Sequence, residues 1–179
     1  MNFRLICNEE NRGYGRALNQ GISLGMDEGS RYFLNLNNDI VIRDADWLEK
    51  IVAPLRDNER RLVGARLIDF NELTRFDGKI EPYLEGWCLA FSHTFVRELG
   101  MFDDDLFLWF EDVELSLRAR RAGYEVMECP AFEWNRHIAY PVRGPLLHLY
   151  GMTGFRQRID FPAISEESRE LVRMKYFER

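Results

Sequence analysis

Two acidic positions stand where the sequence changes from apolar to polar. The first ends the tripeptide Asn37-Asn38-Asp39, which follows the apolar run 32–36 and precedes another at 40–42. In an open α/β sheet, ligands bind beyond the carboxyl ends of the strands, because the loops diverge there. Asp39 is therefore the first candidate for chemistry. Alternatively the tripeptide only makes a turn, since Asn and Asp side chains hydrogen-bond to their own backbone.

The second acidic position is the pair Glu111-Asp112, which follows the aromatic run 107–110 and opens a predicted helix. Acidic residues are common in a first helical turn, because the helix dipole favours them there. The aromatics indicate more than a helix start. Trp109 and Phe110 beside two carboxylates are typical of a sugar site, with a ring for stacking and an ionised oxygen that accepts a hydroxyl proton. The helix terminus would also keep Asp112 ionised near neutral pH.

A glycine-bearing turn, Gly13-Tyr14-Gly15, lies between a predicted strand and a predicted helix. It does not match the dinucleotide-binding fingerprint, because the position of the third glycine is Leu18. Such a turn can still let a base, ribose or phosphate approach the backbone, with Asn11, Gly13 and Arg16 lining it. A simple tight turn is the alternative.

The elements that must position these residues alternate between strands and helices. Apolar runs predict strands at 2–7, 31–36, 61–68, 86–91 and 124–129. Helical spacing predicts helices at 14–26, from about 45 to 55 with Asp44 as its N-cap, and at 93–99, 111–122 and 165–176. Asp77-Gly78 predicts a loop or irregular hairpin within 69–82. The alternation predicts an α/β domain with a mixed, mostly parallel sheet flanked by helices.

Composition excludes several classes of function. The chain has 179 residues, enough for one domain with a sizeable core. A net charge of −6 argues against nucleic-acid binding, which needs clustered cations. The cysteines are three, widely spaced and without a CxxC pair, which fits a reducing compartment. Because no run approaches the roughly 18 apolar residues of a membrane span, we expect a cytoplasmic protein that can work peripherally at the inner face of a membrane.

Four blocks of sequence resemble the family 2 glycosyltransferases, whose nucleotide-diphospho-sugar transferase fold is called GT-A. They are Asn11-Arg12-Gly13-Tyr14-Gly15 with Asn19-Gln20-Gly21, Leu36-Asn37-Asn38-Asp39 with Trp47-Leu48, Gly86-Trp87-Cys88-Leu89-Ala90, and Glu111-Asp112-Val113-Glu114-Leu115 with Arg118 and Gly123. The blocks occur in the family's order and cover about residues 3–137. The resemblance implies a GT-A-like fold that transfers a hexose or deoxyhexose from a nucleotide-diphospho-sugar donor to a carbohydrate or lipid-linked acceptor, as in polysaccharide biosynthesis.

The resemblance also implies a metal site at the donor. The tripeptide 37–39 occupies the family's DxD position, so Asp39 is expected to bind a divalent cation, Mg or Mn, on the donor diphosphate. His137 falls where some relatives place a further metal or diphosphate contact. The residues expected around the donor nucleotide are Asn11, Gly13, Arg16, Asn37 and Asn38.

At the acceptor, the resemblance implies a catalytic base. Asp112, second in the family's ED motif, is expected to deprotonate the acceptor hydroxyl for an inverting in-line displacement at the anomeric carbon. Glu111 is expected to be the second catalytic residue and to help hold the acceptor. Trp87 and Trp109 are expected to contact the acceptor.

Two features depart from the family pattern. Asn37 stands where the motif has its first carboxylate, so the turn supplies one negative charge. The family's first strand and helix are not seen, so we expect an N-terminally truncated transferase domain at 1–140, followed by a loop and helical extension at 141–179. A sheet edge exposed in this way would invite a second copy or a partner chain. The alternatives are an inactive domain that binds sugars or proteins, and a nucleotidyltransferase, although the phosphate loop of the latter is not seen.

Overall fold

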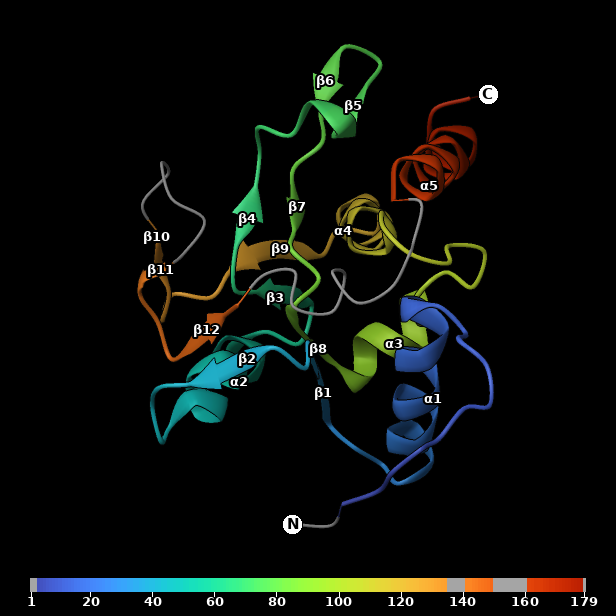
Figure 1. Cartoon of the computed structure of the whole chain (residues 1–179). Coiled ribbons are helices and arrows are strands. Elements are labelled where there is room, and N and C mark those ends of the chain that lie inside the picture. The colour runs from blue at the N-terminus through green and yellow to red at the C-terminus, as the bar shows by residue number, and fades with distance from the viewer. Residues whose placement is uncertain (1–2, 135–140, 150–160, 179) are drawn as a thin grey trace.

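The computed structural model of the chain describes residues 3–134, 141–149 and 161–178. Within them, a four-stranded sheet carries helices on both faces (Figure 1). The helices are α1 (Tyr14–Asp27), α2 (Trp47–Asp57), α3 (His93–Leu99), α4 (Glu111–Arg121) and α5 (Phe161–Tyr176). The strands of this sheet, in spatial order, are β1 (Tyr32–Leu36), β8 (Cys88–Ser92), β3 (Arg61–Gly64) and β9 (Glu125–Glu128).

The sheet is mixed, as the sequence predicts. Strand β8 runs antiparallel to both β1 and β3, whereas β3 and β9 are parallel. Three strands therefore share one direction and β8 alone is reversed among the described strands of this sheet. β1 and β9 form its two edges. The second copy or partner chain expected at an exposed edge stays a prediction.

Alternating side chains of β8 divide the core into two layers. Leu89 and Phe91 pack together with Phe33 of β1 on the face that α1, α3 and α4 cover. Cys88 and Ala90 point to the other face, which α2 covers. Figure 1 shows α2 on one side of the sheet and the other three helices on the opposite side. All residues of β8 are buried, which explains why residues 88–91 form a continuous apolar run.

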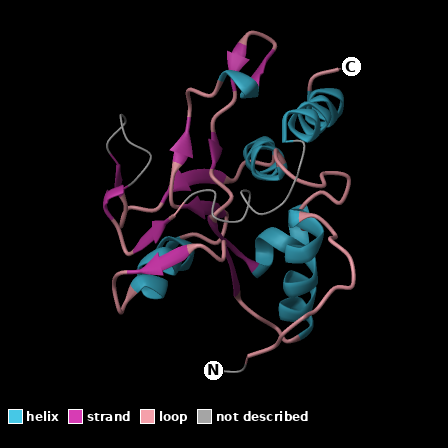
Figure 2. Ribbon diagram, viewed as in Figure 1, coloured by secondary structure: helices cyan, strands magenta, loops and turns pink. Residues whose placement is uncertain are grey.

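Short two-stranded ribbons extend from the sheet (Figure 2). They are β2 (Ile40–Ile42) with β12 (Leu146–His148), β4 (Leu67–Ile68) with β7 (Tyr83–Leu84), β5 (Arg75–Phe76) with β6 (Lys79–Ile80), and β10 (Glu133–Trp134) with β11 (Pro141–Arg143). A 3-10 turn, η1 (Glu72–Thr74), precedes β5. In the β2–β12 ribbon, His148 lies opposite Ile40 and therefore next to Asp39.

The predicted helices agree well with the structure. The bounds of α1, α3 and α4 lie within one residue of the predicted ones, and the β5–β6 hairpin turns at Asp77-Gly78 as predicted. Helix α5 begins at Phe161, four residues before the predicted start. No described helix is long and apolar enough to cross a membrane.

Three local predictions are wrong. Residues 3–7 form no strand, and Phe3 and Leu5 are 86% and 74% exposed, because no described strand pairs with this segment. The predicted strand 61–68 divides into β3 and β4, since β3 pairs within the sheet whereas β4 leaves it to pair with β7. The N-cap of α2 is Asp46, not Asp44. The carboxylate of Asp44 instead accepts a hydrogen bond from Lys50 at 2.8 Å.

Candidate active site

The turn at residues 37–39 connects β1 to β2 and lies beside His148. Nε2 of His148 is 3.0 Å from Oδ1 of Asp39 and 3.2 Å from Nδ2 of Asn37. Oδ1 of Asp39 is buried, and Nε2 of His148 is the polar atom that faces it. Burial lowers the pKa of His148, although the charge of Asp39 opposes this, so the imidazole is neutral at pH 7. A neutral imidazole nitrogen and a carboxylate oxygen this close can both ligate a divalent cation.

These residues fit a cation that is held jointly with a diphosphate. A nucleotide-bound Mg²⁺ takes one or two carboxylates from the protein and the rest of its ligands from phosphates and water. Asp39 and His148 would supply two ligands, and the described residues contain no group of three His, Cys, Asp or Glu side chains that could hold a metal alone. His137, the predicted further contact, lies outside the described residues.

Trp87 supports His148. The two rings are stacked, with centroids 5.0 Å apart and 18° between their planes. The indole Nε1 donates a hydrogen bond to Oε2 of Glu85 at 3.1 Å. Because only 3% of Trp87 is exposed, its ring is used inside the protein, and the acceptor contact expected of it stays a prediction.

The loop 107–110, which precedes α4, holds two strained residues. Trp109 and Phe110 have φ angles of 69° and 65°, in the left-handed region that side chains other than glycine rarely adopt. Hydrogen bonds from two distant parts of the chain hold the loop. The backbone N–H of Tyr14 donates to the carbonyl of residue 107, and the hydroxyl of Ser168 in α5 donates to the carbonyl of residue 108, both at 2.9 Å. Trp109 is 48% exposed, so its indole can meet a bound molecule.

Glu111 and Asp112, the carboxyl pair, begin α4. The Asp112 carboxylate accepts hydrogen bonds from the backbone N–H groups of Gly86 and Val113, each at 2.8 Å. Burial raises the pKa of Asp112 to about 6, and these two hydrogen bonds oppose the rise. Burial and the charge of Asp112 raise the pKa of Glu111 to about 8. Burial and mutual repulsion thus disfavour two negative charges on the carboxyl pair, and Asp112, which accepts the two backbone hydrogen bonds, is the more acidic member.

The predicted nucleotide-binding residues lie at the glycine turn and at the 37–39 turn. Gly13 has a φ of 85°, and a Cβ there would lie 2.4 Å from the carbonyl oxygen of Phe107, so only glycine fits. Asn11 accepts a hydrogen bond from the Gly13 N–H at 3.0 Å. Arg16 donates to the carbonyl of residue 104 at 2.8 Å. Asn38 is exposed in the 37–39 turn. Their contact with a nucleotide stays a prediction.

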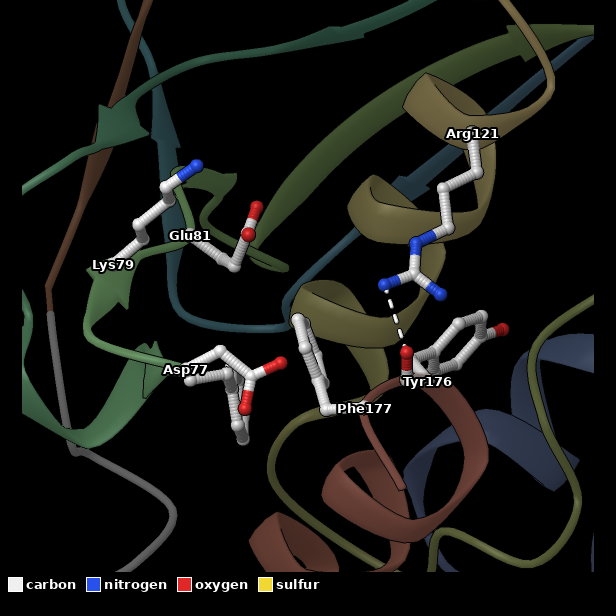
Figure 3. A pocket seen from close by; sticks show the side chains of 7 residues that line it. Asp77, Lys79, Glu81, Arg121, Tyr176 and Phe177 are labelled. Carbon is white, nitrogen blue, oxygen red and sulfur yellow. Dashed lines mark hydrogen bonds between the residues drawn. The ribbon is translucent and has the colours of Figure 1, made fainter. Parts of the chain in front are cut away.

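A cavity of about 370 Å³ lies apart from these groups, between the β5–β6 hairpin and the ends of α4 and α5 (Figure 3). Arg121, which lines it, follows Asp112 by nine residues on α4, roughly 13 Å along the helix axis. Its guanidinium donates a hydrogen bond to the carbonyl of Tyr176 at 3.0 Å. The remaining lining residues are Phe76, Asp77, Lys79, Glu81 and Phe177. The cavity therefore belongs to the opposite end of α4 from the carboxyl pair.

Sequence reasoning found Asp39 and the carboxyl pair but missed His148. Its only signal in the sequence was a lone histidine that follows two apolar residues, Leu146 and Leu147. The pairing of β12 with β2, which joins residues more than a hundred positions apart, brings it to Asp39.

Comparison with known proteins bears on the same residues. The family model described as Glycosyl transferase family 2 matches residues 1–131, which include Asp39 and Asp112. The low-salt glycan biosynthesis hexosyltransferase Agl10 of Haloferax volcanii is 26% identical over 143 residues, which are 66% of this chain and 47% of that protein. The chain thus spans about half the length of this relative. Since the family match extends over well more than half of its residues, the chain belongs to glycosyl transferase family 2.

Proposed function

We propose that this chain transfers a hexose or deoxyhexose from a nucleotide-diphospho-sugar to a hydroxyl group of a carbohydrate or lipid-linked acceptor, with inversion. The observation that carries the proposal is the carboxylate of Asp112, which is ionised at pH 7 and follows the loop that exposes Trp109. A sugar hydroxyl must lose its proton as it attacks, and a positioned carboxylate can accept that proton. The Haloferax volcanii relative is a hexosyltransferase of glycan biosynthesis, which supports the choice of sugar.

In this mechanism each carboxylate has a separate role. The acceptor oxygen forms a bond to the anomeric carbon while its proton passes to Asp112. The bond from that carbon to the diphosphate breaks, and its electron pair leaves with the nucleoside diphosphate. The N–H groups of Gly86 and Val113 hold the Asp112 carboxylate in place, so the base is preorganised before the reaction begins. Glu111, which is protonated at pH 7, keeps a second negative charge away from the reacting oxygen.

Asp39 and His148 would hold the divalent cation, Mg or Mn, on the donor diphosphate. When bound, the cation neutralises negative charge on the leaving diphosphate. Asn37 and Asn38 belong to the same turn and would contact the donor. The proposal also includes a cytoplasmic location, peripheral to the inner face of a membrane. The unpaired state of Cys7, Cys88 and Cys129 supports a reducing compartment.

The experiment that tests the proposal is a calorimetric titration of the chain with UDP, GDP and dTDP, each with and without Mn²⁺. We expect one nucleotide to bind in a Mn²⁺-dependent way, and Asp39→Ala or His148→Ala to abolish this dependence, because each removes one of two protein ligands. Asp69→Ala removes an exposed carboxylate and serves as the control, in which binding should be unchanged. No binding to any nucleotide by a folded sample would instead favour an inactive domain that binds sugars or proteins.

A further inference from the structure

We propose that Tyr14 is a positioning residue whose hydroxyl holds the 37–39 turn and the Gly86 backbone in fixed relative positions. The carboxylates of Asp39 and Asp112 are thereby also held at a fixed distance from each other. The inference rests on the proposed function, in which Asp39 binds the cation and Asp112 is the base. Nothing in the family match or in the relative's name assigns a role to Tyr14.

Tyr14 contacts three loops of the site at once. Its hydroxyl oxygen lies 2.9 Å from Oδ1 of Asn37 and 2.8 Å from the carbonyl oxygen of Gly86, so the single hydroxyl proton is shared between these two acceptors. Its backbone N–H donates to the carbonyl of Phe107 at 2.9 Å. The 37–39 turn, the Gly86 segment and the strained loop before the carboxyl pair thus meet at one side chain.

The contacts on either side of Tyr14 continue to the two carboxylates. Toward Asp39, Nδ2 of Asn37 is 3.2 Å from Nε2 of His148, which is 3.0 Å from Oδ1 of Asp39. Toward Asp112, the N–H of Gly86 donates to the carboxylate at 2.8 Å. An unbroken series of polar contacts therefore runs from one carboxylate to the other, and the phenol is its central member.

The surroundings of Tyr14 favour a fixed position. Nδ2 of Asn35 donates to the phenol oxygen at 3.2 Å and to the Gly86 carbonyl at 2.7 Å. The ring meets Phe102 edge to face, with centroids 6.5 Å apart. Burial, and then the charge of Glu111, raises the pKa of the Tyr14 hydroxyl well above its ordinary value, so it remains a donor at every working pH. A ring that only filled space would need none of these polar partners.

This arrangement predicts an effect on Asp112 that a merely structural tyrosine would not have. The Gly86 N–H favours the ionised form of Asp112 and so lowers its pKa. If the hydroxyl is removed, Gly86 loses one of its two tethers, the hydrogen bond to Asp112 weakens, and the pKa of Asp112 rises. The other titratable groups that face Asp112 are Glu111, Glu85 and Tyr83, and none of them changes in this variant.

The test is a carboxyl carbon NMR titration of the full chain, labelled at aspartate, with Asp112→Asn used to assign the resonance. In Tyr14→Phe we expect the titration midpoint of Asp112 to rise by roughly half a pH unit or more. Tyr124→Phe is the matched control, because the Tyr124 residue is only 4% exposed and its hydroxyl donates to Glu98 at 3.0 Å, away from the carboxyl pair. In Tyr124→Phe the titration midpoint of Asp112 should be the same as in the wild type.

An unchanged midpoint in folded Tyr14→Phe, or an equal shift in Tyr124→Phe, overturns the proposal. If Tyr14→Phe does not fold, Asn35→Ala replaces it, since this change releases both the phenol and the Gly86 carbonyl from one donor. We then expect the same upward shift, and its absence refutes the inference. Because the titration needs no substrate, its result is separate from that of the nucleotide titration, so failure of the proposed function and failure of this inference can be distinguished.

Discussion

Replacing Glu111 by glutamine should stabilise the folded chain, and the gain should grow with pH. Burial and the charge of Asp112 raise the pKa of Glu111 to about 8, from an ordinary value of 4.5 that applies to the unfolded chain. Oε2 of Glu111 is buried and has no hydrogen-bond partner in the described part of the chain. Between these two pKa values the folded state keeps a proton that the unfolded state has lost. The free energy of unfolding therefore falls as pH rises through this window.

The magnitude follows from the two pKa values. A difference of one pKa unit corresponds to about 1.4 kcal/mol. At pH 7 the unfolded carboxyl is 2.5 pH units above its ordinary pKa of 4.5, while the folded one is still largely protonated. Multiplying 2.5 pH units by about 1.4 kcal/mol per unit gives a loss on the order of 3 kcal/mol in the free energy of unfolding at pH 7. The loss is close to zero below pH 4.5. Glutamine is neutral at every pH and has a similar shape, so Glu111→Gln should recover this amount.

The assay is urea unfolding of both proteins at several pH values from 4 to 8, followed by tryptophan fluorescence. The difference in the free energy of unfolding should increase by about 1.4 kcal/mol per pH unit above pH 5. Glu10→Gln, at an exposed position, is the control and should leave the free energy of unfolding unchanged. A difference between Glu111→Gln and wild type that is constant across this range would show that Glu111 does not hold a proton in the folded chain.

Two further predictions concern the base and the glycine turn. Asp112→Asn should lower the rate of nucleoside diphosphate release from the donor by roughly 10² or more, while the affinity for the nucleotide stays the same. The rate of the wild type should fall as pH drops through about 6, the pKa of Asp112. An unchanged rate in Asp112→Asn would show that Asp112 is not the base. Gly13→Ala should lower the free energy of unfolding by clearly more than Gly29→Ala, measured in urea. Both glycines have positive φ, costing roughly 1–2 kcal/mol for alanine, but only at Gly13 would the new Cβ meet a backbone oxygen, at 2.4 Å. Equal losses in the free energy of unfolding of the two variants would show that a Cβ at position 13 does not clash with the carbonyl oxygen of Phe107.

The helices could be predicted from the sequence because their signals are local. The apolar spacing of residues 14–26 and the glycines at 29, 100 and 123 set helix limits without reference to the rest of the chain. Strands depend on partners. The apolar segment 2–7 has the composition of a strand, but residues 3–7 form no ladder with any described strand. The reversed direction of β8 likewise follows from its pairing with β1 and β3, which no local pattern encodes.

The candidate site shows the same division. Asp39 and the carboxyl pair could be found because acidic side chains at a strand end and after an aromatic run are unusual enough to mark chemistry. His148 could not, since its position depends on the register of β12 against β2. The polar contacts of Tyr14 were equally hidden, because Asn37 and Gly86 are 23 and 72 residues away in the sequence.

The charges around the site give a reason for the departure at Asn37. At each of the two acidic centres a single carboxylate faces neutral polar groups. Asp39 lies beside a neutral imidazole and an amide, and Asp112 beside a protonated carboxyl. A second ionised carboxylate at either centre would repel the diphosphate of a donor, most strongly where burial leaves little water to screen the charge. Under the proposed function, the carboxylate of Asp39 and the imidazole of His148 would attract a bare cation weakly but would share a cation that a diphosphate brings. The cation and the nucleotide should therefore bind this chain together, each increasing the affinity for the other.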